Sequence, residues 1–164
     1  METKILFRTA ALIMLFCSGN SFAQTKKTTS LPPVTITQSS AVDPKVTEAF
    51  QTEVNAMDPI WYKLDKKYMV KFMTQDQKNS ALYDKNGYQI YHVTYGTADN
   101  VPNDIIGLVY KSYKDCKINS AIHVNQEQRS IWIVNLEHEG NLILARIEND
   151  QLREVEKLRK SEAQ

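Results

Sequence analysis

The sequence has few glycines and lacks the motifs of the common enzyme classes. Its five glycines are scattered, so they build no loop that would cradle a phosphate group. It contains neither G-x-S-x-G nor H-E-x-x-H, the motifs of serine hydrolases and zinc peptidases. We therefore expect a protein that is not an enzyme and that has no catalytic residue, no cofactor and no metal ion.

Cysteine is also scarce, and one of the two cysteines lies in a segment with the pattern of a signal peptide. Lys4 and Arg8 precede an apolar run from Thr9 to Cys17, and Ser21-Phe22-Ala23 places small side chains where signal peptidase reads them. The apolar run is well short of the ~20 residues that a membrane anchor needs. A lipoprotein signal is a weaker alternative, because bulky Phe16 precedes Cys17. We expect residues 1–23 to be a signal peptide of a periplasmic or secreted protein.

Cleavage between Ala23 and Gln24 would leave 141 of the 164 residues, with one cysteine and no net charge. Loss of Glu2, Lys4 and Arg8 from 20 basic and 19 acidic residues leaves 18 of each. The mature chain then has no basic excess to attract nucleic acid, and we expect no stable membrane insertion. Cys116 alone cannot form an intramolecular disulfide. It is either a small buried residue or a link to a second chain in a homodimer.

The remaining chain divides by composition into a spacer, one domain and a tail. Residues 24–41 are rich in Thr, Ser and Lys and predict a flexible spacer, with a short edge strand at Val34 and Ile36 as the alternative. Residues 42–155 form the domain. An internal repeat predicts a strand at 151–155, whereas Leu152, Val155 and Leu158 have helical spacing. We therefore expect a short strand that frays into a helical or disordered tail at 156–164.

Two amphipathic helices and a series of alternating strands are expected in the domain. The first helix begins at Asp43-Pro44 and ends at Asp58-Pro59, because proline suits the first helical position and disfavours a helical residue before it. The second begins at Pro102, with an apolar face formed by Ile105, Ile106, Val109, Tyr110 and Tyr113. Asp84-Lys85-Asn86-Gly87 predicts a tight hairpin turn between two strands.

An internal repeat links the two halves of the domain. Residues Tyr68, Val70 and Phe72 match Trp132, Val134 and Leu136 at a shift of 64 positions, and the helices match at a shift of 58. Each half has a helix followed by three strands with short connections. The predicted fold class is α+β, with two α-β-β-β units that form an antiparallel sheet and two helices packed on one face.

The alternation assigns the strand residues to two faces. If the matched residues of the repeat face the helices, their neighbours face the opposite side. The predicted partner-binding face then contains Met69, Lys71, Met73, Ile131, Ile133 and Asn135. Apolar side chains among polar ones suit a surface that binds a protein or peptide. The alternative is that the spacer, the tail or a second copy of the protein covers this face.

The histidines suggest a metal site less strongly than a surface role. Glu137-His138-Glu139 precedes Gly140-Asn141, which is typical of a solvated hairpin turn. A zinc site would need further ligands such as His92 or His123, and the spacing does not require these residues to converge.

The order and spacing of these motifs resemble the PepSY-like family of exported bacterial proteins, which are also described as β-lactamase-inhibitor-like. The resemblance covers about residues 42–155. It rests on a helix that ends before Trp61, followed by YMVKF, LYDKNG, VPNDIIGLVYKSY and the strand pair IWIVNL and LILARI. This chain departs from the pattern at Asp150-Gln151, where many members have an Asp-Gly turn.

The resemblance implies an exported, non-enzymatic binding module. Related PepSY domains occur in propeptides of thermolysin-like peptidases, and β-lactamase-inhibitor proteins hold an enzyme on a concave sheet. We therefore expect the chain to bind or inhibit a peptidase or another envelope protein through the open face of its sheet. The alternative is an extracytoplasmic sensor or carrier that binds a small ligand or a metal.

Overall fold

The computed structural model describes residues 33–53, 55–75 and 77–160. The predicted signal peptide and most of the predicted spacer lie outside these residues and remain predictions. Within the described part of the chain, no helix is long and apolar enough to cross a membrane.

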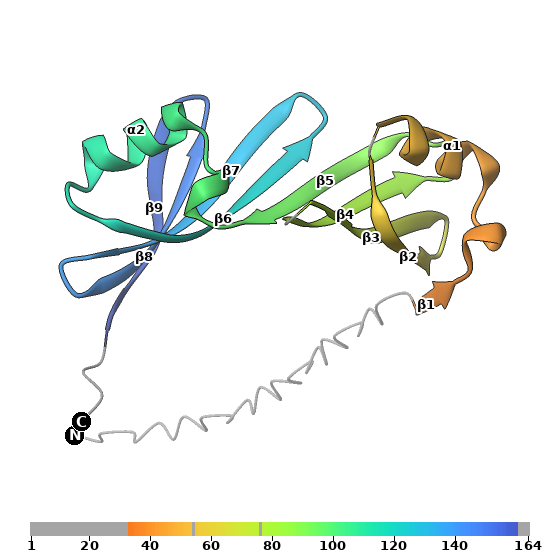
Figure 1. Cartoon of the computed structure of the whole chain (residues 1–164), viewed down its shortest axis with the longest axis horizontal. Helices are drawn as coiled ribbons and strands as arrows, with labels where there is room; N and C mark the ends of the chain where they lie inside the picture. Colours follow the sequence, from red (N-terminus) through yellow and green to blue (C-terminus); the bar gives the residue numbers. More distant parts are fainter. Residues whose placement is uncertain (1–32, 54, 76, 161–164) are drawn as a thin grey trace, which may run out of the picture. The chain divides into compact units, whose positions relative to one another are not determined.

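Within these described residues, nine antiparallel strands form one sheet in which each strand pairs with its neighbours in sequence. Two α-helices and two short 3-10 helices interrupt the strands (Figure 1). The first half contains β1 Val34–Thr37, α1 Pro44–Glu53, β2 Met57–Leu64, β3 Lys67–Thr74, β4 Gln77–Asp84 and β5 Gln89–Gly96. The second contains α2 Asn103–Ser112, β6 Lys117–Gln126, β7 Arg129–His138, β8 Asn141–Glu148 and β9 Gln151–Arg159. The prediction of an α+β fold with an antiparallel sheet is confirmed.

Both helices cover the same face of the sheet (Figure 1). Directly paired residues on adjacent strands point to one side. A row of such partners runs from Phe72, which packs with α1, to Ile147, which packs with α2. The members between them are Asn79, Thr94, His123 and Trp132. We call this side the helix face and the other side the open face.

Aromatic side chains dominate the core beneath α1. Phe50 of α1 meets Trp61, Phe72 and Tyr83 in edge-to-face contacts, with ring centroids 5.3, 5.0 and 6.5 Å away. Such contacts stabilise by roughly 0.5–1.5 kcal/mol each beyond the burial of the rings. Val46 and Val70 are fully buried beside them. The amphipathic pattern around Asp43-Pro44 thus places one helical face on β2, β3 and β4.

Aliphatic side chains form a second core beneath α2. Val109 is fully buried and Ile105 nearly so, and they pack with Val134, Leu136 and other apolar residues of β6, β7 and β8. At the end of the helix the Tyr113 hydroxyl donates a hydrogen bond of 3.0 Å to the Glu154 carboxylate of β9. Burial and this bond raise the pKa of Tyr113 to about 12.

The helices differ from the prediction in two respects. The first helix ends at Glu53, and Met57-Asp58-Pro59 already belong to β2, whose pairing with β3 competes successfully with the helical spacing of Met57. Trp61 therefore lies inside a strand. In α2, Tyr110 is exposed and Leu108 packs against the core in its place.

The predictions of a flexible spacer and of a frayed tail are wrong for the residues that the structure describes. Val34–Thr37 form β1, which pairs with Trp61–Leu64, as the edge-strand alternative proposed. At the other end β9 extends to Arg159 instead of fraying after residue 155. Its backbone pairs with β8 along nearly its whole length, and an irregularity near Ala145 shifts the register. Backbone pairing explains why the helical spacing of Leu152, Val155 and Leu158 did not produce a helix.

The turn before β9 forms without glycine. Asn149 and Asp150 connect the strands with φ angles of 50° and 57°. Asparagine and aspartate tolerate this left-handed conformation, which two-residue hairpin turns of type I′ require. The departure from an Asp-Gly turn therefore leaves the last hairpin intact.

Candidate functional site

The open face contains all six residues of the predicted partner-binding face. Lys71 belongs to a row of paired residues that crosses to Ile131 through Ser80, Val93 and Val124. Met73 belongs to the next row, which crosses to Ile133 through Lys78, Tyr95 and Ile122. Strands β3 and β7 are four spacings apart, about 19 Å. The structure thus places the two groups of predicted residues on one continuous surface.

The six residues differ in their access to a partner. Lys71 is exposed, whereas Met69, Met73, Ile133 and Asn135 are half-buried. Ile131 retains only 9% of its surface and offers little contact area. The role of this set in binding stays a prediction.

The sequence reasoning missed the centre of the open face. On β5 and β6, the open-face residues Tyr91, Val93, Ile122 and Val124 are half-buried and apolar or aromatic. Their alternation along β5 and β6 is visible in the sequence. It does not reveal that β5 and β6 pair, because a helix separates them in the chain.

A groove with a volume of about 460 Å³ lies at the β2 side of the open face. Lys71 and Met73 of the predicted set line it, together with Ile60, Lys78 and Tyr95. Ile60 and Tyr95 keep 50% and 47% of their surface exposed. Ser80, Asp58, Phe72 and Asn79 complete the lining. Asn135 lies elsewhere, in a second groove of about 310 Å³ formed by β7, β8 and β9.

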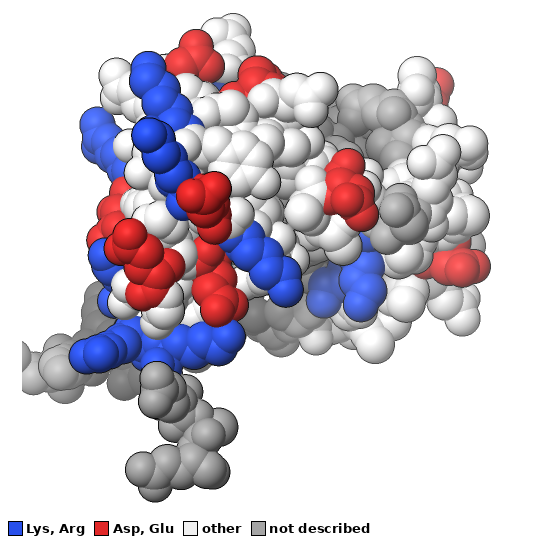
Figure 2. All heavy atoms as spheres, turned by 60° about the vertical axis from the view of Figure 1, so that its left-hand side comes forward, with Lys and Arg blue, Asp and Glu red and all other residues white. Residues whose placement is uncertain are grey.

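The cations at the two ends of the open face have different partners. At the β8 end Glu148 binds two arginines: its Oε1 accepts from Arg129 Nε at 2.7 Å, and its Oε2 accepts from Arg146. The bond to Arg129 lowers the pKa of Glu148 and raises the pKa of Arg129. At the groove, Lys71 Nζ lies 5.2 Å from the centre of the Tyr62 ring. Figure 2 shows basic and acidic side chains interspersed on another side of the molecule.

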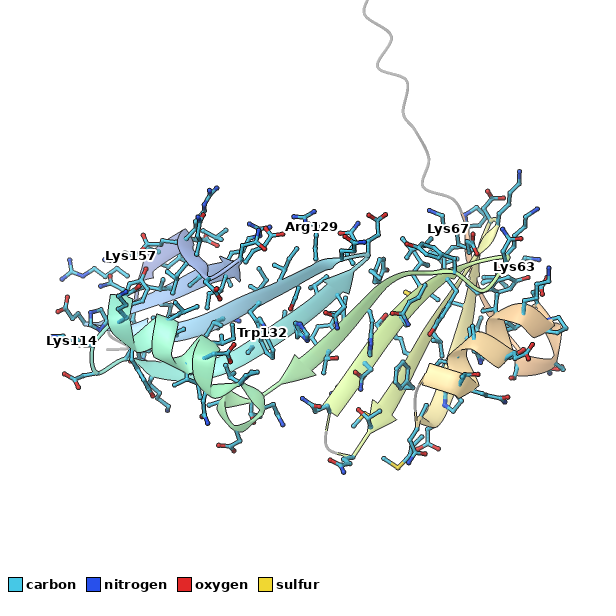
Figure 3. The ribbon with its side chains drawn as sticks, turned by 90° about the horizontal axis from the view of Figure 1, so that it is seen from above. Lys63, Lys67, Lys114, Arg129, Trp132 and Lys157 are labelled. Atoms are coloured by element: carbon cyan, nitrogen blue, oxygen red, sulfur yellow. The ribbon has the colours of Figure 1, made fainter. Side chains whose placement is uncertain are left out.

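Two histidines occupy the helix face between the helices. His123 stacks on Trp132, with ring centroids 4.3 Å apart and 7° between the planes, and its Nε2 lies 2.8 Å from Ser130 Oγ. Trp132 is seen in Figure 3 on the part of the sheet that neither helix covers. His92 Nε2 lies 3.0 Å from Asn79 Oδ1. Burial lowers the pKa of both histidines, and the proximity of His123 lowers that of His92 further.

These histidines do not form a metal site with other ligands. The structure contains no cluster of three or more His, Cys, Asp or Glu side chains that could hold a metal ion, as far as its described residues go. His138 ends β7 and Glu139 adopts a φ of 48° in the turn, so this segment is the expected hairpin. Cys116 is buried, and burial raises the pKa of its thiol, which favours the protonated form.

In the described part of the chain, a nine-stranded antiparallel sheet with two helices on one face makes an α+β fold, and solved structures share it. The chain is similar in structure to a BLIP-like protein from Bacteroides fragilis, with a TM-score of 0.55 and 14% identity over 70% of this chain and 86% of that one. It is also similar to a DUF2874 family protein from Bacteroides uniformis, with a TM-score of 0.51 and 16% identity over 68% and 88%.

A further neighbour is a candidate periplasmic protein from Bacteroides eggerthii, with a TM-score of 0.52 and 11% identity over 70% of this chain and 89% of that one. No family model and no curated protein matches the sequence. At these identities the neighbours establish the fold alone, and the resemblance to PepSY-like proteins stays a prediction.

Proposed function

We propose that this protein is an exported, non-enzymatic binding module that holds a protein or peptide partner on its open face. The observation that carries the proposal is the set of half-buried apolar side chains that β3, β5, β6 and β7 place on this one face, from Met69 to Ile133. Removing exposed apolar surface of this kind from water stabilises the complex with a partner that covers it. A peptidase or another envelope protein is the expected class of partner, as the resemblance to PepSY-like proteins implies.

The comparisons support the proposal through the names of two neighbours. One is described as BLIP-like and another as a candidate periplasmic protein. A periplasmic or secreted location also agrees with the N-terminal pattern of Lys4, Arg8 and Ser21-Phe22-Ala23.

The two-unit arrangement belongs to the same proposal. The sequence predicted three strands after each helix, whereas the described part of the structure has four after each. We propose that α1 with β2–β5 and α2 with β6–β9 descend from one repeated unit. Val70 and Val134, which match at the shift of 64, are both fully buried, and so are Ala81 and Ala145 at the same shift. Two fused units place both helices on one face of a single nine-stranded sheet in the described residues. The opposite face is then wide enough for a protein partner.

The test is a capture experiment with a face-directed variant and a matched control. The mature protein is used to capture partners from envelope and secreted fractions, and each captured protein is purified and its affinity measured by calorimetry. In the variant Met69→Asp/Ile133→Asp, two carboxylates would be buried at the interface, so we expect the affinity to fall about 100-fold or more. The control Tyr110→Asp/Ser112→Asp adds the same charge on the exposed side of α2 and should bind normally.

Circular dichroism establishes that both variants fold. If the open-face variant folds and retains the affinity of the wild type, the partner binds elsewhere. If the wild type captures no protein that binds again after purification, the proposed function is wrong.

A further inference from the structure

Among the described residues, the groove on the open face carries two lysines that form no ion pair with an acidic side chain. Lys71 and Lys78 lie on adjacent strands, and each is flanked by apolar groups: Lys71 pairs with Ile60 across β2, and Lys78 pairs with Met73 and Tyr95. Lys71 and Lys78 are diagonal neighbours, so their Cβ atoms are about 7–8 Å apart. Both side chains are exposed. A single anionic group between the strands is within reach of both ammonium groups.

Near the β8 end of the sheet, three cations form ion pairs with carboxylates. Arg129 and Arg146 share Glu148, and Lys160 bonds Glu137 Oε1 at 2.9 Å. In the part of the chain that the structure describes, neither Lys71 nor Lys78 forms an ion pair, although Asp58 lines the same groove. Asp58 offsets one of the two charges, so the groove keeps a positive excess over an apolar floor.

We infer that this groove binds an acidic segment of the partner protein, with a carboxylate between Lys71 and Lys78 and a neighbouring apolar side chain against Ile60, Met73 and Tyr95. The inference rests on the proposed function and names the chemistry of its ligand. A carboxylate that accepts hydrogen bonds from two ammonium groups gains charge-assisted bonds, and the apolar floor excludes water from them.

Charge also decides between the occupants of the groove. The segment before β1, QTKKTTSLPP, contains two lysines and no acidic residue, so it would bring like charges to the groove. A second copy docked through a twofold axis here would place Lys71 and Lys78 against themselves. An acidic segment of another protein complements the groove.

The test uses a labelled peptide as the probe. The octapeptide Gly-Ser-Glu-Leu-Glu-Phe-Gly-Ser and a twin with glutamine in place of both glutamates are titrated with the mature protein by fluorescence anisotropy at low salt. We expect the acidic peptide to bind at least about tenfold more tightly than the twin, because a hydrogen bond to a charged group contributes about that factor. The variant Lys71→Met/Lys78→Met keeps the aliphatic stems and should abolish this difference.

The control variant is Lys63→Met/Lys157→Met. It removes two exposed lysines that belong to the helix face by register and lie at opposite ends of the sheet (Figure 3). It changes the net charge equally and should keep the preference for the acidic peptide. Equal binding of the two peptides, or an unchanged preference in Lys71→Met/Lys78→Met, would overturn the inference.

The proposed function is tested separately by the partner that the open face captures. If that partner still depends on Met69 and Ile133 while the acidic peptide shows no preference, the binding module stands and the groove assignment falls. If the acidic peptide binds as expected but no partner is captured, the groove assignment stands and the wider proposal falls.

Discussion

At the scale of single residues, Asn79 organises the polar part of the helix face. Its side chain is buried with 5% of its surface exposed. Its Nδ2 donates to Thr74 Oγ1 at 2.7 Å and to the Gln77 carbonyl at 3.0 Å, and its Oδ1 accepts from Thr94 Oγ1 at 2.9 Å. The Nε2 atom of His92 lies 3.0 Å from the same Asn79 Oδ1. A buried amide with all of its groups satisfied specifies the register of β4 and β5, because a one-residue slip would leave these groups unpaired.

The buried histidine predicts a pH dependence of stability. Burial, and secondarily His123, lowers the pKa of His92 below its ordinary value of 6.5, so the native state favours the neutral imidazole. His92 therefore binds its proton at a higher pH in the unfolded chain than in the native protein. The contribution of neutral His92 to the free energy of unfolding is therefore complete above pH 6.5. It is lost as the pH falls from there through the native pKa.

Calorimetry from pH 7.5 to pH 5 tests this dependence. In His92→Gln an amide can keep the contact with Asn79 and does not titrate, so we expect the fall in Tm to be smaller than in the wild type. His138→Gln removes a histidine at the end of β7 and serves as the control. A native pKa of His92 at or above 6.5, measured by NMR, would contradict the prediction.

At the scale of elements, the β4–β5 hairpin packs against the start of α1. The hairpin turn is held by Asp84, whose carboxylate accepts from the backbone N–H groups of Asn86 at 2.8 Å and Tyr88 at 3.0 Å. These bonds lower the pKa of Asp84. Gly87 follows with a φ of 86°, and a Cβ there would lie 2.7 Å from the carbonyl oxygen of Lys45. Glycine is required both by the turn and by the close approach of the helix.

A glycine pair predicts how much this approach matters. Gly140, in the β7–β8 turn, also has a positive φ of 73°, but a Cβ there would meet no atom within 4 Å. We expect Gly140→Ala to cost about 1–2 kcal/mol for the left-handed conformation alone. Gly87→Ala adds overpacking against Lys45 and should cost about 2–4 kcal/mol. Urea unfolding measures both values, and equal costs would show that the hairpin moves away from α1 freely.

At the scale of the whole molecule, two separate cores share one sheet. The α1 core and the α2 core consist of different residues. Strands β5 and β6 connect them through continuous pairing from His92–Asn125 to Gly96–Ala121. The backbone hydrogen bonds across this junction belong to both halves. We therefore expect the sheet to unfold as one cooperative unit.

A mutation in one core and a reporter in the other test this coupling. Phe50→Ala removes a ring that meets three other aromatic rings, and we expect it to cost about 3–5 kcal/mol. In the background Trp61→Phe, Trp132 is the single remaining tryptophan and reports the far half. The urea midpoint from Trp132 fluorescence should then fall as much as the midpoint from circular dichroism. An unshifted Trp132 transition would show that the halves unfold independently.

Local chemistry made much of the fold predictable from the sequence. Asp43-Pro44 marks the start of α1, and Pro102 lies immediately before the first residue of α2, because proline suits the start of a helix. Asp84-Lys85-Asn86-Gly87 forms the predicted hairpin because its side-chain carboxylate and its glycine satisfy the turn locally. Alternation along β3 and β7 was enough to divide their residues between two faces.

What the sequence alone determined is therefore local: where the helices start, where the chain turns and which residues of a strand share a face. The tertiary structure decided β1 and the junction of β5 with β6, because their backbone partners lie beyond an intervening helix, and the full length of β9, because pairing with β8 overrides its helical spacing. The tertiary structure also decided which residues line the groove. Lys71 and Lys78 come together because Lys78 pairs with Met73 across β3 and β4, and strand register decides which side chains are neighbours.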